Sequence, residues 1–148
     1  KTNEFMIRIY EATEPSDLLA EAFARLLPQL SERMTAPDRE AVARIVASPA
    51  TRQLVAAAED GRIVGLLSVA LYDVPSGRKA WIEDVVVDAA TRGRGIGEAL
   101  VREALALARR EGVARVMLTS NATRRAAHRL YERMGFVRYE TDCFRLDL

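Results

Sequence analysis

A cluster of arginine and glycine at positions 92–97, Arg-Gly-Arg-Gly-Ile-Gly, has the residue types and the spacing to bind a phosphate group. Its alternating glycines carry no Cβ, so backbone N–H groups can come close to a ligand there. A helical pattern starts inside the cluster, and the unpaired N–H groups at a helix N-terminus favour an anion. The guanidinium groups of Arg92 and Arg94 suit phosphate oxygens. This cluster, which we call the Arg/Gly loop, therefore predicts a pyrophosphate-binding site.

The spacing of the glycines excludes two common nucleotide-binding motifs. A dinucleotide-binding fingerprint requires G-x-G-x-x-G in an early βαβ unit, with an acidic residue at the end of the next strand. Here the spacing is G-x-G-x-G, and the next predicted strand ends in Ser120-Asn121. A P-loop requires G-x-x-x-x-G-K-[ST], and neither lysine nor threonine comes directly after Gly97. From the residues alone, the alternative is a tight turn that only needs flexible backbone.

Hydrophobic periodicity places the Arg/Gly loop between a strand and a helix. The predicted strands are 5–11, 54–59, 62–72, 79–88, 115–120, 136–139 and 144–148, and the predicted helices are 16–30, 37–47, 96–110 and 124–134. Asp60-Gly61 is a strong hairpin signal between two of these strands. The order predicts an α/β protein with a mixed sheet and helices on its faces. Without repeats or linkers, residues 1–148 are expected to form a single domain.

The composition excludes several classes of function. Lys and Arg number 22 against 21 Asp and Glu, so the net charge of +1 predicts no general attraction to nucleic acid or to a membrane surface. Cys143 and His128 are each single in the chain, which predicts neither a disulfide framework nor a metal site. No apolar stretch is long enough to span a bilayer and no signal peptide is evident, so a cytoplasmic protein is expected.

Two motifs resemble those of the GNAT superfamily of N-acetyltransferases. Arg92-x-x-Gly95-x-Gly97 is similar to the acyl-coenzyme A signature R/Q-x-x-G-x-G/A, and residues 127–136 are similar to A-x-x-L-Y-E-x-x-G-F. The order of the predicted elements also fits that family over nearly the whole chain. The resemblance implies a GNAT-like fold, with a mostly antiparallel sheet of about seven strands flanked by about four helices. It also implies acetyl-CoA as cosubstrate, without a metal.

The same resemblance implies which residues contact the coenzyme. The backbone of the strand at 85–87 is expected to pair with the pantetheine chain and to donate a hydrogen bond to the oxyanion. Many members of the family carry Asn at the position of Arg124, whereas this chain has Asn121 three residues earlier. The expected coenzyme-binding residues are Val85, Val86, Val87, Arg92, Gly93, Arg94, Gly95, Ile96, Gly97, Asn121, Ala127 and Arg133.

Acetylating an amine requires a base, because an alkylammonium group loses its proton only near pH ~10. Glu83 and Asp84 come shortly before the Arg/Gly loop, and strand alternation directs them to opposite faces of the sheet. The family often has a carboxylate at this point, so the resemblance favours Glu83 as the base. Pairing of either carboxylate with an arginine is the alternative.

The departing coenzyme A thiolate requires a proton, and the resemblance implies that Tyr131 supplies it, because a phenol can donate at neutral pH. The alternative is a tyrosine of the hydrophobic core, since Leu130 and Met134 of the same helix face the interior. The two catalytic candidates are therefore Glu83 and Tyr131.

The leading hypothesis is direct transfer of an acetyl group, in a ternary complex, from acetyl-CoA to the primary amine of a small molecule. A protein acetyltransferase that acts on a lysine or an N-terminal amine is an alternative, as is a non-catalytic acyl-CoA-binding module. The segment 82–88 is similar to that of glucosamine-6-phosphate N-acetyltransferases, although the start of the helix that carries Tyr131 differs. The sequence names no acceptor, and it leaves a homodimer open.

Overall fold

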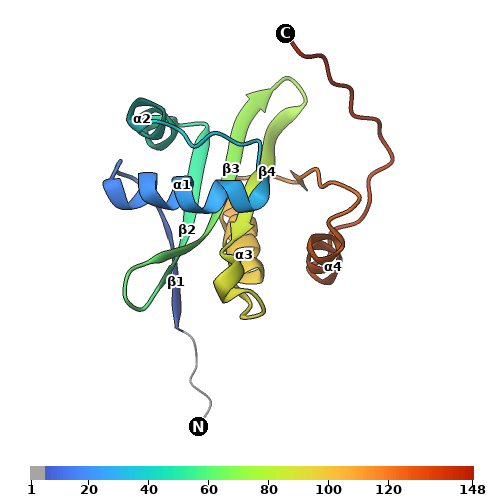
Figure 1. Ribbon diagram of the computed structural model, residues 1–148. Coiled ribbons are helices and arrows are strands. Elements are labelled where there is room, and N and C mark those ends of the chain that lie inside the picture. Colours follow the sequence, from blue (N-terminus) through green and yellow to red (C-terminus); the bar gives the residue numbers. More distant parts are fainter. Residues whose placement is uncertain (1–5) are drawn as a thin grey trace.

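Alternating and β-branched runs pair into one five-stranded sheet in a computed structural model that describes residues 6–148 (Figure 1). The strands are β1 (Ile7–Glu11), β2 (Thr51–Ala58), β3 (Ile63–Val74), β4 (Gly77–Val87) and β5 (Val116–Met117), in that order across the sheet. The first four pair antiparallel, and β5 joins β4 in parallel. The predicted mixed and mostly antiparallel sheet is therefore confirmed.

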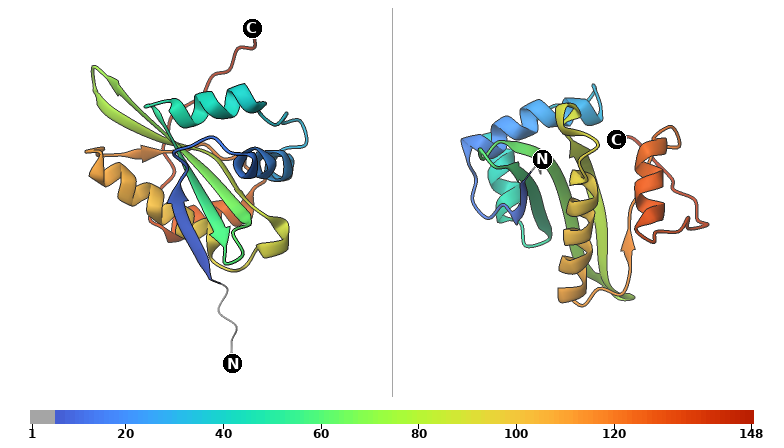
Figure 2. Two further views of the ribbon diagram at one scale, coloured as in Figure 1. Left: turned by 90° about the vertical axis from the view of Figure 1, so that its left-hand side faces the viewer. Right: turned by 90° about the horizontal axis from the view of Figure 1, so that it is seen from below.

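Four helices and one short 3₁₀ helix complete the described chain: α1 (Asp17–Leu30), α2 (Arg39–Ala47), η1 (Ala89–Thr91), α3 (Ile96–Arg110) and α4 (Arg125–Arg133). Side chains cap the first two: Ser16 Oγ accepts from Leu19 N at 3.1 Å, and Asp38 Oδ1 accepts from Ala41 N at 2.8 Å. Figure 2 shows α1 and α2 on one face of the sheet and α3 on the other, with α4 beside the sheet. The four predicted helices are confirmed.

Each face of the sheet has its own hydrophobic core. The α1 side is filled by residues that include Phe23, Leu26, Val55, Leu66 and Val86. The α3 side is filled by residues that include Leu54, Leu67, Ile82, Leu100 and Tyr131. The hairpin predicted at Asp60-Gly61 joins β2 to β3, with Gly61 at φ 88° and Asp60 Oδ1 accepting from Arg62 N. Burial on both faces holds β3 and β4 rigidly in the middle of the sheet.

The C-terminal segment, residues 137–148, contains no strand, so the strands predicted at 136–139 and 144–148 are not formed. Its residues are exposed throughout, Phe144 to 91% and Leu146 to 84%. Figure 1 shows it leading away from the sheet beyond α4. Local alternation of apolar and polar residues suits a strand, but a strand also requires a paired neighbour, which this segment lacks within residues 6–148. The sheet consequently has five strands where about seven were expected.

Two further boundaries differ from the predictions. The strand expected at 115–120 is paired only at Val116–Met117. The first strand was expected from Phe5, which lies outside the described residues. None of the helices within residues 6–148 is long and apolar enough to cross a bilayer. The same residues contain no cluster of three or more His, Cys, Asp or Glu side chains arranged to hold a metal ion.

Candidate active site

The Arg/Gly loop connects η1 to α3, and two of its glycines have a backbone that other residues rarely adopt. Gly93 and Gly95 lie at φ 79° and 77°, in the left-handed region. A Cβ built on either would meet nothing within 4 Å, so the space beside the loop is open on that side. Gly97 is different, because its Cβ would lie 3.3 Å from Leu130 Cδ2 of α4. Gly93 and Gly95 shape the loop, whereas Gly97 allows α4 to pack.

The N-terminus of α3 is available to an anion. Its N-cap is Gly95, and no side chain hydrogen-bonds the first turn, in contrast to the caps of α1 and α2. The side chain of Ile96 is buried in the α3-side core, so only its backbone faces the loop. The side chains of Arg92 and Arg94 are exposed beside it. Unpaired N–H groups, a helix dipole and guanidinium groups together fit a pyrophosphate.

The outer edge of β4 is free next to this loop. β5 pairs only with Ala80 and Trp81, so within residues 6–148 no strand covers that edge of β4 from residue 82 to residue 87. Val85 and Val87 pack partly buried on the α3 side, and Val86 is buried on the α1 side. The side chains of these valines are therefore held in the two cores, and the backbone is the part that a ligand can pair with.

A β-bulge interrupts β4 at the same place. Ser68 of β3 is opposite Glu83 and Leu66 is opposite Val86, so Asp84 and Val85 together face a single β3 residue. Asp84 is the one residue other than glycine in the described chain with a positive φ, 50°. Bulges expose backbone groups that the ladder would otherwise use. The unpaired edge and the bulge thus supply backbone N–H donors beside Glu83.

Glu83 lies on the same side of β4 as α1, on a part of the sheet that α1 leaves uncovered. We call this part the open face, and it consists of Lys79, Trp81 and Glu83 of β4 with their β3 neighbours Tyr72, Ala70 and Ser68. Partial burial of the carboxyl raises the pKa of Glu83, and the negative charge of Asp84 raises this pKa further. A carboxylate with a raised pKa and an accessible side chain suits a general base.

A polar pair missed by the sequence analysis lies beside Glu83. Gln53 of β2 is opposite Ser68, which is opposite Glu83, so the three form one row across the sheet. Gln53 is buried, and its Nε2 donates to the carbonyl oxygens of Leu54 and Leu67 at 3.2 and 3.3 Å. Its Oε1 therefore faces Ser68, whose Oγ donates to it at 2.7 Å. The one signal in the sequence was Ser68, a polar residue inside the apolar run from Ile63 to Leu71, whereas Gln53 follows two other polar residues, Thr51 and Arg52.

The direction of these hydrogen bonds determines what Ser68 can offer to a ligand. A hydroxyl has one proton, and the proton of Ser68 is given to Gln53. Only the lone pairs of Ser68 Oγ remain, so they can accept a hydrogen bond but the group cannot donate a second one. An ionised Glu83 is also only an acceptor. The two neighbouring groups therefore suit a ligand that donates hydrogen bonds, such as an ammonium.

Tyr131 lies in the α3-side core, on α4. It is 7% exposed, and its ring meets Phe136 edge to face with centroids 5.7 Å apart. Burial raises the pKa of Tyr131, and the charge of Arg124 opposes this in part. The preceding residue, Leu130, is the one that packs against Gly97. Close packing of α4 on the start of α3 thus ties the position of the phenol to the Arg/Gly loop.

Comparison with known proteins decides the family. Residues 7–136 match the model of the Acetyltransferase (GNAT) family. The chain belongs to this family. A probable glucosamine 6-phosphate N-acetyltransferase of Oryza sativa is 36% identical over 141 residues, covering 88% of this chain and 81% of that protein. This GNAT chain also resembles a mycothiol acetyltransferase of Thermomonospora curvata, with 36% identity over 89 residues, and it spans only 29% of that protein's length.

Solved structures agree with the GNAT assignment. An acetyltransferase of Trypanosoma brucei has a TM-score of 0.78 at 30% identity, covering 97% of this chain and all of the other, 100%. An aminoglycoside acetyltransferase from a soil metagenome has a TM-score of 0.85 at 21% identity, covering 100% and 99%, which shows likeness of fold. The mixed α/β architecture of the chain is therefore a GNAT fold.

The remaining residues expected to contact the coenzyme differ in how accessible they are. Asn121 is exposed, but its Oδ1 accepts from Thr123 N and Thr123 Oγ1, both at 2.9 Å, which leaves its amide N–H groups to donate. Ala127 packs partly buried against the α3-side core. Arg133 is exposed in the last turn of α4. Of these three, Asn121 and Arg133 present polar groups to solvent.

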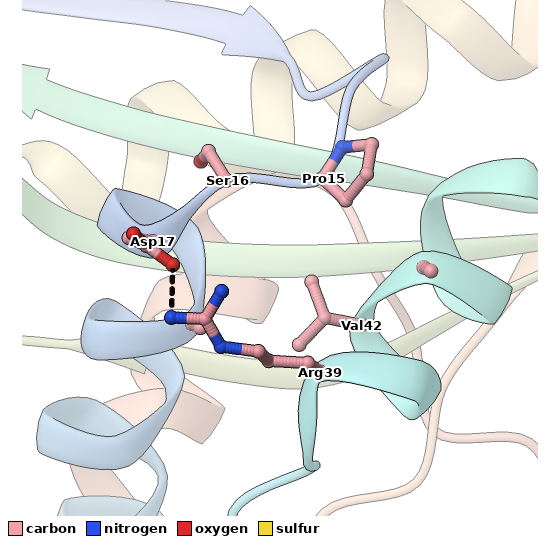
Figure 3. Close-up of a pocket in the computed structure, with 7 residues that line it drawn as sticks. Pro15, Ser16, Asp17, Arg39 and Val42 are labelled. Atoms are coloured by element: carbon pink, nitrogen blue, oxygen red, sulfur yellow. Dashed lines mark ion pairs between the residues drawn. The ribbon is translucent and has the colours of Figure 1, made fainter.

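A pocket of about 420 Å³ lies away from all of these residues. It is lined by Pro15, Ser16, Asp17, Ala20, Arg39, Val42 and Ala43, between the start of α1 and α2 (Figure 3). Exposed Asp17 and Arg39 form an ion pair of 2.7 Å across it. The part of α1 that meets the β4–α3 connection is the other end of the helix, at Arg25 and Gln29. The pocket contains none of the predicted catalytic or coenzyme-binding residues.

Proposed function

We propose that residues 1–148 form one acetyl-CoA-binding N-acetyltransferase domain, which transfers the acetyl group directly, in a ternary complex, to the primary amine of a small molecule. The observation that carries this proposal is the position of Glu83. Its carboxyl lies on the open face of β4, immediately before the bulge at Asp84 and beside the unpaired edge of the strand. A base is thereby next to the backbone donors that an acetyl thioester requires.

On the acceptor side, Glu83 takes one proton from the substrate ammonium, directly or through a water molecule, which leaves a neutral amine. The amine nitrogen then bonds to the thioester carbonyl carbon, and the carbonyl oxygen receives the electron pair of the C=O bond. Backbone N–H groups of β4 near the bulge stabilise this oxyanion. The nitrogen loses its second proton to solvent.

On the coenzyme side, the C–S bond breaks as the carbonyl re-forms, and the sulfur leaves with the electron pair. The Tyr131 phenol gives its proton to this thiolate and recovers one from solvent. Burial raises the pKa of Tyr131, so the phenol is in its protonated form at neutral pH. Glu83 returns its proton to solvent, so the products are an amide and the free thiol, with release of one proton overall.

The open face also supports a class of acceptor. Lys79, Trp81 and Glu83 point to the same side of β4 at intervals of two residues, so a cation, an aromatic ring and a carboxylate lie in a row. Lys79 and Glu83 are four positions apart, which separates their Cα atoms by about 13 Å along the strand. The long lysine side chain can bring its ammonium group closer to Glu83 than that. An amino sugar phosphate would place its ammonium at Glu83 and Ser68 and its phosphate at Lys79. The named glucosamine 6-phosphate relatives support the same class.

The test is a thiol-release assay with acetyl-CoA and a panel that contains glucosamine 6-phosphate, glucosamine, amino acids and a lysine peptide. We expect turnover with the phosphorylated sugar, and we expect Lys79→Met to raise its KM while leaving the KM for glucosamine unchanged. Tyr72→Phe, on the same face, is the matched control. Turnover with the peptide alone would favour a protein acetyltransferase. Coenzyme binding without turnover of any amine would favour a non-catalytic acyl-CoA-binding module.

We further propose that the chain forms a homodimer through its C-terminal segment. Phe144, Leu146 and Leu148 alternate with the charged Arg145 and Asp147, and all five are exposed. Such a strip has the pattern of a strand whose partner is another molecule, and a second copy of the chain supplies one. Light scattering after size exclusion should give twice the chain mass. Phe144→Glu with Leu146→Glu should give the monomer mass, and a monomeric wild type would exclude this proposal.

A further inference from the structure

The last turns of α1 are bonded to the segment that precedes the Arg/Gly loop. Arg25 Nη1 donates to Asp88 Oδ2 at 2.9 Å, and Arg25 Nη2 donates to the carbonyl oxygen of Ile63 at 2.7 Å. Gln29 Oε1 accepts from Ala89 N at 2.8 Å. α1 packs on β3 and β4 (Figure 1). The open face lies on the same side of the sheet. α1 therefore contacts both the side of the sheet that carries the open face and the segment just before the Arg/Gly loop.

Asp88 is the centre of these contacts. It is one of two buried polar residues among those described, and its side chain is 8% exposed. Its backbone N–H donates to Val64 O at 2.8 Å, and its carbonyl accepts from Thr91 N and Thr91 Oγ1 at 2.9 and 3.1 Å. Its Oδ1 accepts from Ala90 N at 3.1 Å. Every polar group of Asp88 is hydrogen-bonded. These bonds fix the conformation of the chain where it leaves β4 and enters η1.

Burial by itself would raise the pKa of the Asp88 carboxyl. The hydrogen bonds from Ala90 and Gln29 and the charges of Arg25 and Arg62 outweigh that effect, so the pKa is lowered. Arg62 Nη2 lies 3.8 Å from Asp88 Oδ2 on the hairpin side. The carboxyl is therefore ionised at neutral pH, as charge-assisted hydrogen bonds from Arg25 and the η1 backbone require.

We propose that Arg25 and Gln29 are positioning residues for the coenzyme: by fixing residues 88–90, they hold the Arg/Gly loop in the shape that binds the pyrophosphate. This inference rests on the proposed function. Neither residue is expected to touch the reacting atoms, since both act through Asp88 and Ala89. The loop begins at residue 92, directly after η1. A displacement of residues 88–90 would therefore also move the start of the loop. Left-handed Gly93 and Gly95 make the loop intrinsically flexible, which is why it needs a fixed start.

The test uses Gln29→Ala, because Gln29 is exposed and its loss removes both the acceptor for Ala89 N–H and the amide that donates to Asp88 Oδ1 at 3.5 Å, without opening the core. Asp17→Asn is the matched control, since Asp17 is an exposed residue at the other end of the same helix and its ion pair is with Arg39. Two probes are titrated: coenzyme A, which has the pyrophosphate, and S-acetylpantetheine, which lacks it.

We expect Gln29→Ala to weaken coenzyme A binding about three- to tenfold, the range for one lost hydrogen bond. Binding of S-acetylpantetheine, followed by amide chemical shifts, should be unchanged. Unchanged affinity for coenzyme A, or equal losses with both probes, would overturn the inference. A wild type that binds coenzyme A but acetylates no amine would overturn the proposed function alone, because the binding comparison can still be made.

Discussion

Gly97 and Leu130 approach so closely that a Cβ on Gly97 would lie 3.3 Å from Leu130 Cδ2. This contact joins the helix that starts at the Arg/Gly loop to the helix that carries Tyr131. The group proposed to hold the pyrophosphate and the group proposed to protonate the thiolate are therefore kept at a fixed separation by packing. Of the three alternating glycines, the third belongs to this helix contact.

We expect Gly97→Val to slow acetyl transfer more than it weakens coenzyme binding, because the added methyl groups force Leu130 and the adjacent Tyr131 away. Overpacking of this kind costs about 1–3 kcal/mol. Leu130→Ala in the same chain should restore part of the rate, which a double-mutant cycle of kcat measures. Identical losses with and without Leu130→Ala would show that the contact does not position the phenol.

Gly95→Ala tests the shape of the loop. We expect weaker binding of coenzyme A, because alanine at φ 77° is strained by about 1 kcal/mol and the loop relaxes to another shape. Gly112→Ala is the matched control, since Gly112 has φ 75° and open space around it but follows the far end of α3. Calorimetric titration should show a loss of affinity for the first variant only. Equal stability losses with unchanged affinity in both would contradict a role for Gly95 in binding.

Tyr131→Phe should lower kcat by about 10²–10⁴, the usual contribution of a general acid, while leaving the affinity for acetyl-CoA near that of the wild type. Because the pKa of Tyr131 is raised by burial, the phenol stays protonated above its ordinary range, near pH ~10. The activity of the wild type should therefore show no decline assignable to this group below that pH. If Tyr131→Phe has the kcat of the wild type, the thiolate takes its proton from solvent and Tyr131 is not the general acid.

Asp84→Asn tests the base through its pKa. The charge of Asp84 raises the pKa of Glu83, so its removal lowers that pKa. Glu83 acts as a base only when ionised, hence the acidic limb of kcat/KM should move to lower pH in this variant. Asparagine tolerates the positive φ at this position, which makes the substitution mild. Glu83→Gln should abolish the limb altogether, and an unshifted limb in Asp84→Asn would argue against Glu83 as the titrating group.

Asp88→Asn should lower the free energy of unfolding at neutral pH by about 1–3 kcal/mol, because charged hydrogen bonds to Arg25 and to the η1 backbone are weakened. The pKa of Asp88 is lowered in the folded chain, so its contribution is complete above the unfolded value, near ~3.9, and is lost as the pH falls through the folded value. Denaturant titrations at several pH values should show the difference between wild type and variant shrinking below pH ~4. A constant difference would contradict the ionised state.

The parts of the fold that depend on near neighbours in sequence were predictable. The helices, the Asp60-Gly61 hairpin and the glycines of the Arg/Gly loop are local patterns, and each lies where it was expected. The bulge at Asp84 was not predictable, because it arises from the register between β3 and β4. The Gln53–Ser68 pair required the same cross-strand register. The strands predicted at 136–139 and 144–148 are absent because a local pattern alone does not make a strand. Residues 137–148 have the alternation but no paired neighbour among the described residues.

The contact between α1 and residues 88–90 has a consequence for how affinities are measured. α1 packs on the side of the sheet that carries the open face, and it is hydrogen-bonded to Asp88 and Ala89 just before the Arg/Gly loop, so a shift of this helix would displace both proposed binding sites together. Thermodynamic linkage then makes the effect mutual: the factor by which acetyl-CoA changes the affinity for the amine equals the factor by which the amine changes the affinity for acetyl-CoA. If the two proposed sites are coupled in this way, an acceptor dissociation constant has a defined value only at a stated coenzyme concentration.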